Sequence, residues 1–170
     1  MDIILKRSIE WLDRLIAFDT TSRLSNLDLI SDIEKYMNEL GVPTRLTHDK
    51  DKTKANLWCT IGPQDIGGVV LSGHTDVVPI DGQEWTKTPF RMSEESGKLF
   101  GRGTSDMKGF CAIALAMAPE MKSRDLKVPI HFAFSFDEEV GCVGVRHLIK
   151  DVVDNLPLPR AVIVGEPTSM

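Results

Sequence analysis

The 170-residue sequence has no long hydrophobic run and no basic segment ahead of an apolar one. Its longest apolar stretch, residues 110–118, is far shorter than the roughly 20 residues that cross a bilayer, which argues against a transmembrane helix. At the N-terminus, Lys6 and Arg7 follow the apolar residues, whereas an export signal carries its basic residues first. We therefore predict a cytoplasmic protein with no membrane partner.

Cysteine is scarce, and positive charge is not in excess. Cys59, Cys111 and Cys142 are odd in number and lack CxxC spacing, so they predict buried reduced thiols rather than disulfides. The 25 acidic and 20 basic residues give a formal charge of −5, which argues against the basic surface that nucleic-acid binding needs. We expect no nucleic-acid partner.

Hydrophobic patterning predicts a single α/β domain. Apolar residues at helical spacing predict two helices within residues 1–40, separated by a polar loop at 20–26, and two more at 107–121 and 143–153. Short apolar runs predict strands at 56–62, 67–73, 128–136 and 161–165, a weaker strand at 44–47, and a solvated hairpin tip at 48–54. Strands that alternate with helices predict a three-layer sandwich with a mostly parallel or mixed central sheet, covered on both faces.

Three details of the helices are expected from local signals. Ser25 or Asn26 is expected to cap the second helix. The third helix is expected to bury a stripe that includes Phe110 and Ile113. Pro119 is expected to end or kink that helix, because proline has no N–H to donate.

A histidine or a carboxylate follows each of several predicted strands. His74 and Asp76 follow strand 67–73, Asp106 follows a short strand at 98–100, residues 137–139 follow strand 128–136, and Glu166 follows strand 161–165. In open α/β sheets, ligands bind outside the carboxyl ends of the strands. We therefore expect these side chains to meet at one edge of the sheet.

Taken singly, each residue has an ordinary structural explanation, such as a core histidine, a helix cap, a solvated turn or an ion pair. Taken together, the carboxylates would repel and raise one another's pKa values unless a cation lay among them. These carboxylates are Asp76, Asp106, Glu138, Glu139 and Glu166. The basic residues nearby, Arg102 and Lys108, are too few to neutralise them, so the sequence predicts divalent metal.

The donor types favour a catalytic metal site. One imidazole with carboxylates, and no paired thiolates, suits Zn²⁺, Co²⁺ or Mn²⁺ in a catalytic centre better than a structural zinc site. A carboxylate can bridge two ions roughly 3.5–4 Å apart, as in two-metal hydrolases. Two competing motifs are weak, because residues 101–106 lack the third glycine of a dinucleotide loop and Ser72 lacks a GxSxG elbow.

Four segments, SGHTDVVP, GRGTSDMKGF, DEEVGCVG and GEPT, resemble the successive signatures of the M20 metallopeptidases. The resemblance spans residues 11–168 and implies an incomplete, zinc-dependent exopeptidase-like catalytic domain that hydrolyses amides with two divalent ions, Zn²⁺ or Co²⁺. Within the family, the chain is most similar to the acetylornithine deacetylase branch of arginine biosynthesis, with the succinyl-diaminopimelate desuccinylases as near neighbours. The implied substrate is an N-acyl amino acid, with N2-acetylornithine the first choice.

The resemblance also implies ligands for each ion. His74 and Glu166 would hold one ion, and Glu139 would hold the other. Asp106 would bridge the two ions, and a cis peptide bond is implied after it.

Two further carboxylates would act beside the ions. Asp76 would orient the His74 imidazole. Glu138 would be the general base, taking a proton from water and returning it to the leaving amine. Adjacent Glu138 and Glu139 can divide these duties, because neighbouring side chains of an extended segment point in different directions.

Members of this family are considerably longer than this chain. The resemblance implies that residues 1–170 are the N-terminal portion of the catalytic domain, without the dimerisation and lid domain or the C-terminal catalytic segment. His48, His131 and His147 are poor substitutes for the metal-binding histidine that this segment brings. We therefore expect an inactive fragment of a homodimeric parent, with exposed apolar surface. The alternative is a non-catalytic metal-binding domain. The number of metal ions that the chain binds would distinguish this domain from part of an enzyme.

Overall fold

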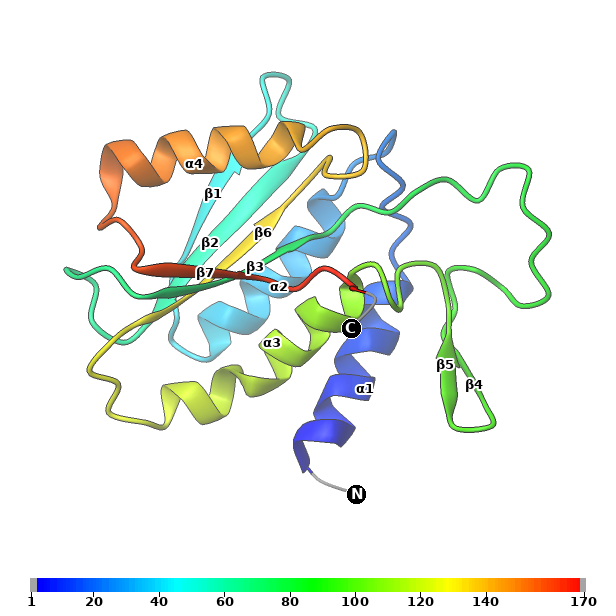
Figure 1. Ribbon diagram of the computed structural model, residues 1–170, viewed down its shortest axis with the longest axis horizontal. Coiled ribbons are helices and arrows are strands. Elements are labelled where there is room, and N and C mark those ends of the chain that lie inside the picture. The colour runs from blue at the N-terminus through cyan, green and yellow to red at the C-terminus, as the bar shows by residue number, and fades with distance from the viewer. Residues whose placement is uncertain (1–2, 169–170) are drawn as a thin grey trace.

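A five-stranded mixed sheet between helical layers forms the centre of the computed structural model, which describes residues 3–168 (Figure 1). The strand order is β1-β2-β6-β3-β7. Neighbours β1, β2 and β6 pair antiparallel, whereas β6, β3 and β7 pair in parallel. The strands are β1 (Thr44–His48), β2 (Ala55–Ile61), β3 (Val69–His74), β6 (Ile130–Ser135) and β7 (Ala161–Val164). The predicted fold class is therefore confirmed.

Helices cover both faces of this sheet. On one face, α2 (Leu27–Glu39) and α3 (Lys108–Lys122) contact the strands, and α1 (Ile3–Ile16) packs along α3. On the other face lies α4 (Val143–Asn155), set apart from the other helices in Figure 1. Because β2 and β6 are covered on both sides, nearly all of their side chains are buried.

The predicted strand at 98–100 exists but does not belong to the central sheet. It is β5 (Lys98–Phe100), which pairs only with β4 (Ser93–Glu95) in a separate hairpin. The expectation that Asp106 reaches the sheet edge from a central strand is therefore wrong. Asp106 arrives there because it lies just before α3, whose N-terminus faces that edge.

Helix α3 differs from the sequence prediction in two respects. Pro119 does not end it, and the helix continues to Lys122, where the Tyr36 hydroxyl donates a hydrogen bond (3.1 Å) to the Leu115 carbonyl that the missing proline N–H leaves free. Ile113 is 53% exposed, so the predicted buried stripe is wrong there. The buried side of α3 consists mainly of small residues, which let α1 and the sheet approach it closely.

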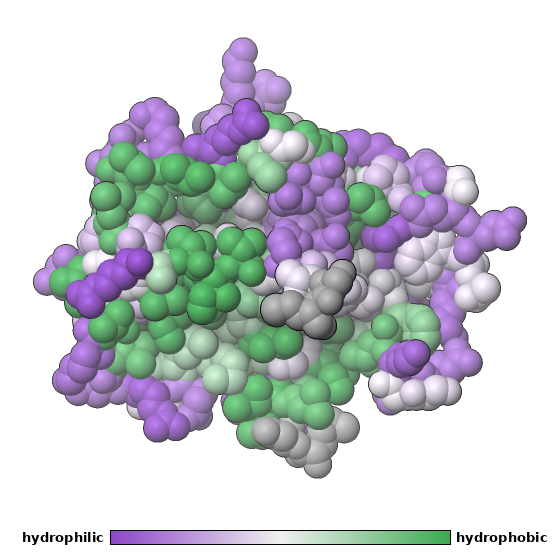
Figure 2. Space-filling view, in the orientation of Figure 1, coloured by the Kyte–Doolittle hydropathy of each residue, from purple (hydrophilic) through white to green (hydrophobic). Residues whose placement is uncertain are grey.

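Strand β7 and the outer side of α4 leave apolar surface uncovered. Val162 and Val164 are 55% and 59% exposed, so β7 lacks the cover expected for such an apolar strand. With Ile149, Val153 and Leu158 they line one groove, which lies in the hydrophobic area of Figure 2. The expected exposed apolar surface is thus confirmed. None of the helices between residues 3 and 168 is both long and apolar enough to cross a membrane.

The three cysteines are free, but only two are buried. Cys59 and Cys111 lie in the core, as expected, whereas Cys142 is exposed. The expectation of a buried thiol is wrong for Cys142 because it lies in the turn before α4, where its backbone is left-handed (φ 53°).

Candidate metal centre

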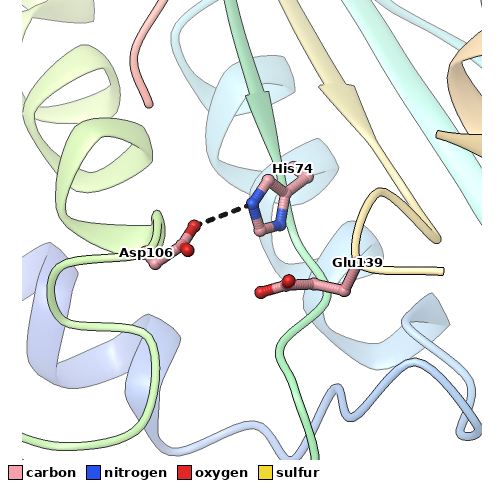
Figure 3. A group of neighbouring side chains, drawn as sticks. All are labelled: His74, Asp106 and Glu139. Atoms are coloured by element: carbon pink, nitrogen blue, oxygen red, sulfur yellow. Dashed lines mark hydrogen bonds and ion pairs between the residues drawn. The ribbon is translucent and has the colours of Figure 1, made fainter. Parts of the chain in front are cut away.

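Histidine 74 lies at the centre of the predicted carboxylate cluster. It is the last residue of β3, and because β6 and β7 run parallel to β3, the segments that follow all three strands meet at the same sheet edge. Its Nε2 atom lies 3.1 Å from Asp106 Oδ1, 3.4 Å from Glu166 Oε1 and 3.8 Å from Glu138 Oε2. The side chains of His74, Asp106 and Glu139 point toward one another in Figure 3.

Two overlapping sets of donor atoms in this cluster are close enough to share a cation. His74, Asp106 and Glu139 form one set, and His74, Glu138 and Glu166 form the other. Within each set, one donor atom per residue lies within 4.8 Å of the others. All the residues predicted to hold metal are therefore brought together, and Glu138 joins them. The peptide bond that follows Asp106 is cis, as the resemblance implies.

The basic residues nearby do not satisfy these carboxylates. Lys108 is buried, and its ammonium donates hydrogen bonds to the main-chain oxygens of Leu15 (3.0 Å) and Phe18 (2.9 Å). Arg102 donates to Gln83 and stacks over Trp85. The cluster thus retains excess negative charge, and a divalent cation fits its imidazole and carboxylate donors.

Burial and neighbouring charges shift several pKa values in the cluster, upward as expected for Glu139 and Glu166 but downward for Asp76. Burial lowers the pKa of His74, but Asp76 and Glu166 outweigh it and raise the pKa to about 9. Burial raises the pKa of Glu139, and the neighbouring Asp106 raises it further. Burial also raises the pKa of Glu166; His74 opposes this shift, whereas Asp106 and Glu138 add to it. Burial and like charges both disfavour the ionised form of a carboxylate.

The His74 ring has a fixed orientation. Its Nδ1 atom donates to the main-chain oxygen of Asp76 at 2.9 Å, which leaves Nε2 facing the carboxylates. The Asp76 carboxylate is farther away, with Oδ1 3.5 Å from Nδ1. Asp76 therefore contacts the imidazole mainly through its backbone, a detail that the sequence did not predict.

The Asp76 carboxylate instead holds the segment that carries Glu138 and Glu139. Its Oδ1 accepts the Glu138 N–H (3.0 Å), and its Oδ2 accepts the Ser22 hydroxyl (2.7 Å) and the Glu139 N–H (3.3 Å). Burial raises the pKa of Asp76, but the nearby His74 ring and the hydrogen bonds from Ser22 and Glu138 outweigh it and lower the pKa. This carboxylate links β3 to both glutamates.

The sequence did not predict that several polar residues support the site, because these residues lie in or beside a segment interpreted as a polar loop. The Thr20 hydroxyl donates to the Thr75 oxygen (2.5 Å), and the Asn26 amide donates to the Thr75 hydroxyl (3.0 Å). Asn26 occupies the N-cap position of α2, but its side chain does not cap the helix, since it also bonds the backbone of Ala55. Their only sequence signal is a run of hydroxyl and amide residues between two amphipathic helices.

Lys54 was also missed. The segment 48–54 contains the predicted hairpin turn, but Lys54 turns inward and donates to the Ser22 oxygen and to Asp137. The other histidines lie away from the cluster: His48 ends β1, His131 lies in β6, and His147 lies in α4. Within residues 3–168, none of these three belongs to a group that could hold metal.

The His74 pKa predicts a pH dependence of the metal-free chain. Because the folded-state pKa of about 9 exceeds the ordinary 6.5, His74 contributes stability that is full below pH 6.5 and is lost as the pH rises through about 9. In EDTA, the thermal midpoint of the wild-type chain should fall over this interval relative to a His74→Gln variant, which has no titrating ring. Parallel pH profiles for the two chains would contradict this assignment.

The chain resembles a known family of peptidases. Residues 70–170 match the peptidase family M20/M25/M40. The chain is 37% identical to the acetylornithine deacetylase of Shigella sonnei (strain Ss046) over 147 residues, which make up 86% of this chain and 37% of that protein. It therefore spans little more than a third of the length of this relative.

Two solved structures share the fold at low sequence identity. Human carnosine dipeptidase 1 superposes with a TM-score of 0.78 at 23% identity, over 96% of this chain and 40% of the other. The M20 family metallo-carboxypeptidase Sso-CP2 from Sulfolobus solfataricus gives 0.74 at 24% identity, over 97% of this chain and 37% of the other. With more than half of its length matched to the family, this chain belongs to the M20/M25/M40 peptidases.

Proposed function

We propose that this chain supplies the metal-binding part of a hydrolase that removes the acetyl group from N2-acetylornithine in arginine biosynthesis. The observation that carries the proposal is the cluster of His74 with Asp106, Glu138, Glu139 and Glu166 at one sheet edge. The 37% identity to an acetylornithine deacetylase supports the substrate. Succinyl-diaminopimelate is the next substrate to test.

In this proposal each site residue has a role that its position supports. His74 and Glu166 would hold one ion and Glu139 the other, and Asp106 would be a ligand of both; Zn²⁺ is the first choice and Co²⁺ the second. Two bound ions would lower the pKa of a water molecule and stabilise the charge that develops on the amide oxygen.

Glu138 is proposed to move the proton. Its Oε2 atom faces His74, and its side chain is 36% exposed beside a pocket of about 220 Å³ that has room for the acyl group. The carboxylate accepts a proton from the attacking water and returns it to the leaving nitrogen. Asp76 holds Glu138 in place through the Glu138 N–H.

We further propose that residues 1–170 form the N-terminal portion of the catalytic domain of a longer enzyme. A further domain of that enzyme mediates homodimerisation, and the enzyme is cytoplasmic. The greater length of the relatives supports the first statement, and three free cysteines agree with a reducing compartment.

Metal titration tests the proposal directly. We expect Zn²⁺ to raise the thermal midpoint of the EDTA-treated chain, because free metal at about 100 times its Kd stabilises a protein by about 2.7 kcal/mol. Two ions should bind, and Asp106→Asn should reduce this stoichiometry. N-acetylornithine hydrolysis is measured on the complete polypeptide that contains the chain, while the 170 residues alone should show little turnover. Metal binding without hydrolysis by the complete polypeptide would indicate a non-catalytic metal-binding domain.

A further inference from the structure

Lys54 lies between the two segments that hold the Asp76 carboxylate. Its ammonium donates to the main-chain oxygen of Ser22 on one side and to Asp137 Oδ1 (2.6 Å) on the other. The side chains of Lys54 and Asp137 are only 15% and 16% exposed, so water screens this ion pair weakly. The contact joins the end of the β1–β2 hairpin to the turn after β6.

Both segments that Lys54 joins donate hydrogen bonds to Asp76. Ser22 does so through its hydroxyl, and the turn after β6 does so through the N–H groups of Glu138 and Glu139. Polar contacts therefore run from Ser22 to Lys54, from Lys54 to Asp137, and from Glu138 to Asp76 and back to Ser22. The peptide bond between Asp137 and Glu138 closes them into a ring that includes the glutamate-bearing turn. In such a ring, each contact limits the freedom of the groups that make the next one.

The turn after β6 begins at a residue with an uncommon backbone conformation. Asp137 has a positive φ of 54°, a backbone conformation that residues other than glycine seldom adopt. Its carbonyl accepts the Val143 N–H (3.0 Å), and its carboxylate is held by Lys54. The Lys54 ion pair thus acts on the residue that begins the turn and sets the direction in which Glu138 and Glu139 leave it.

We propose that Lys54 is a positioning residue for Glu138 and Glu139, which fixes their turn against Asp76 in the geometry that holds metal. Lys54 lies outside both donor sets and acts through Asp137 and Ser22. The inference rests on the proposed metal site, but the order it ascribes to the turn is present without metal and can be measured there.

The test compares three variants with the wild-type chain. Lys54→Met removes the charge at similar length, Lys54→Arg retains it, and Lys50→Met is the matched control, an exposed lysine of the same loop. Amide hydrogen exchange of the metal-free chain reports on the Glu138 and Glu139 N–H groups. Titration with Zn²⁺ and the visible absorption spectrum of the Co²⁺-loaded chain report on the metal site.

Lys54→Met should speed exchange at Glu138 and Glu139 by about tenfold or more while β2 and β6 keep their protection. It should weaken Zn²⁺ binding by about 10–100-fold, the range seen when the partners of metal ligands are removed. It should also alter the Co²⁺ spectrum. Lys54→Arg should recover part of each effect, and Lys50→Met should match the wild type.

Wild-type exchange and metal affinity in Lys54→Met would overturn the inference, as would an equal loss of protection throughout the sheet, which indicates general destabilisation. If Lys54→Met does not fold, Asp137→Asn decides, because it breaks the same ion pair and leaves the Lys54–Ser22 contact in place. A wild-type chain that binds no metal would refute the proposed function, whereas the exchange comparison would still decide the role of Lys54.

Discussion

Replacing Glu138 with glutamine should reduce N-acetylornithine hydrolysis by about 10²–10⁴-fold, the usual contribution of a general acid–base group. Glutamine keeps the size of the side chain but cannot accept the proton. Glu138 Oε1 lies 3.2 Å from the Cys142 thiol and its Oε2 lies 3.8 Å from His74, so one oxygen is held at the rim while the other faces the cluster. The measurement is kcat on the complete polypeptide, with metal content determined on the same samples.

Metal content separates two roles for Glu138, since one of the two donor sets includes it. A proton-transfer role predicts unchanged metal content in Glu138→Gln, whereas loss of metal together with activity would make Glu138 a ligand. Glu94→Gln, on the exposed β4 strand, is the matched control and should leave both quantities unchanged. Near-normal turnover in Glu138→Gln would refute the general-base role.

Replacing Asp76 with asparagine should strongly destabilise the chain. The carboxylate is buried and accepts hydrogen bonds from the Ser22 hydroxyl and from the N–H groups of Glu138 and Glu139. In asparagine, an NH₂ group replaces one of the accepting oxygens and leaves a buried donor without a partner. Breaking a buried charged interaction in this way costs about 3–5 kcal/mol, which should be seen in urea unfolding of the metal-free chain.

The loss of stability in Asp76→Asn should depend on pH in a definite direction. The folded-state pKa of Asp76 lies below its ordinary value of 3.8, so its contribution is full above that value and is lost as the pH falls through the folded-state pKa. The difference in the free energy of unfolding between the wild type and Asp76→Asn should therefore become smaller in acid. Asp81→Asn is the control, because Asp81 is 65% exposed and pairs with Arg23 at the surface, where water screens the ion pair and its loss should change the stability little. Equal losses in both variants would contradict the role of Asp76.

The donors of the cluster could be predicted because their signal is local. His74 ends one apolar strand and Glu166 follows another, and parallel strands bring such residues to one edge of the sheet whatever the details of packing. Asp106 was placed correctly for a partly wrong reason, since β5 pairs outside the central sheet. Asp106 follows β5 and precedes α3, and the sequence alone does not show which of these two elements brings it to the sheet edge.

The supporting residues could not be predicted because their partners lie far away along the chain. Ser22 bonds Asp76, and Lys54 bonds Asp137, contacts that depend on how separate loops pack. A polar loop that supports a site has the same composition as a solvated one. Pro119 shows the same limit, since only the packed structure places the Tyr36 hydroxyl at the free carbonyl of Leu115.

The position of β7 determines when the cluster can be completed during folding. β7 pairs with β3, although α3, β6 and α4 all lie between the two strands along the chain. Contacts between such distant segments form slowly, because a long loop must close first. Glu166 follows β7, so during synthesis it is the last of the donors to leave the ribosome. Until β7 adds to the sheet, the cluster around His74 lacks the Glu166 carboxylate.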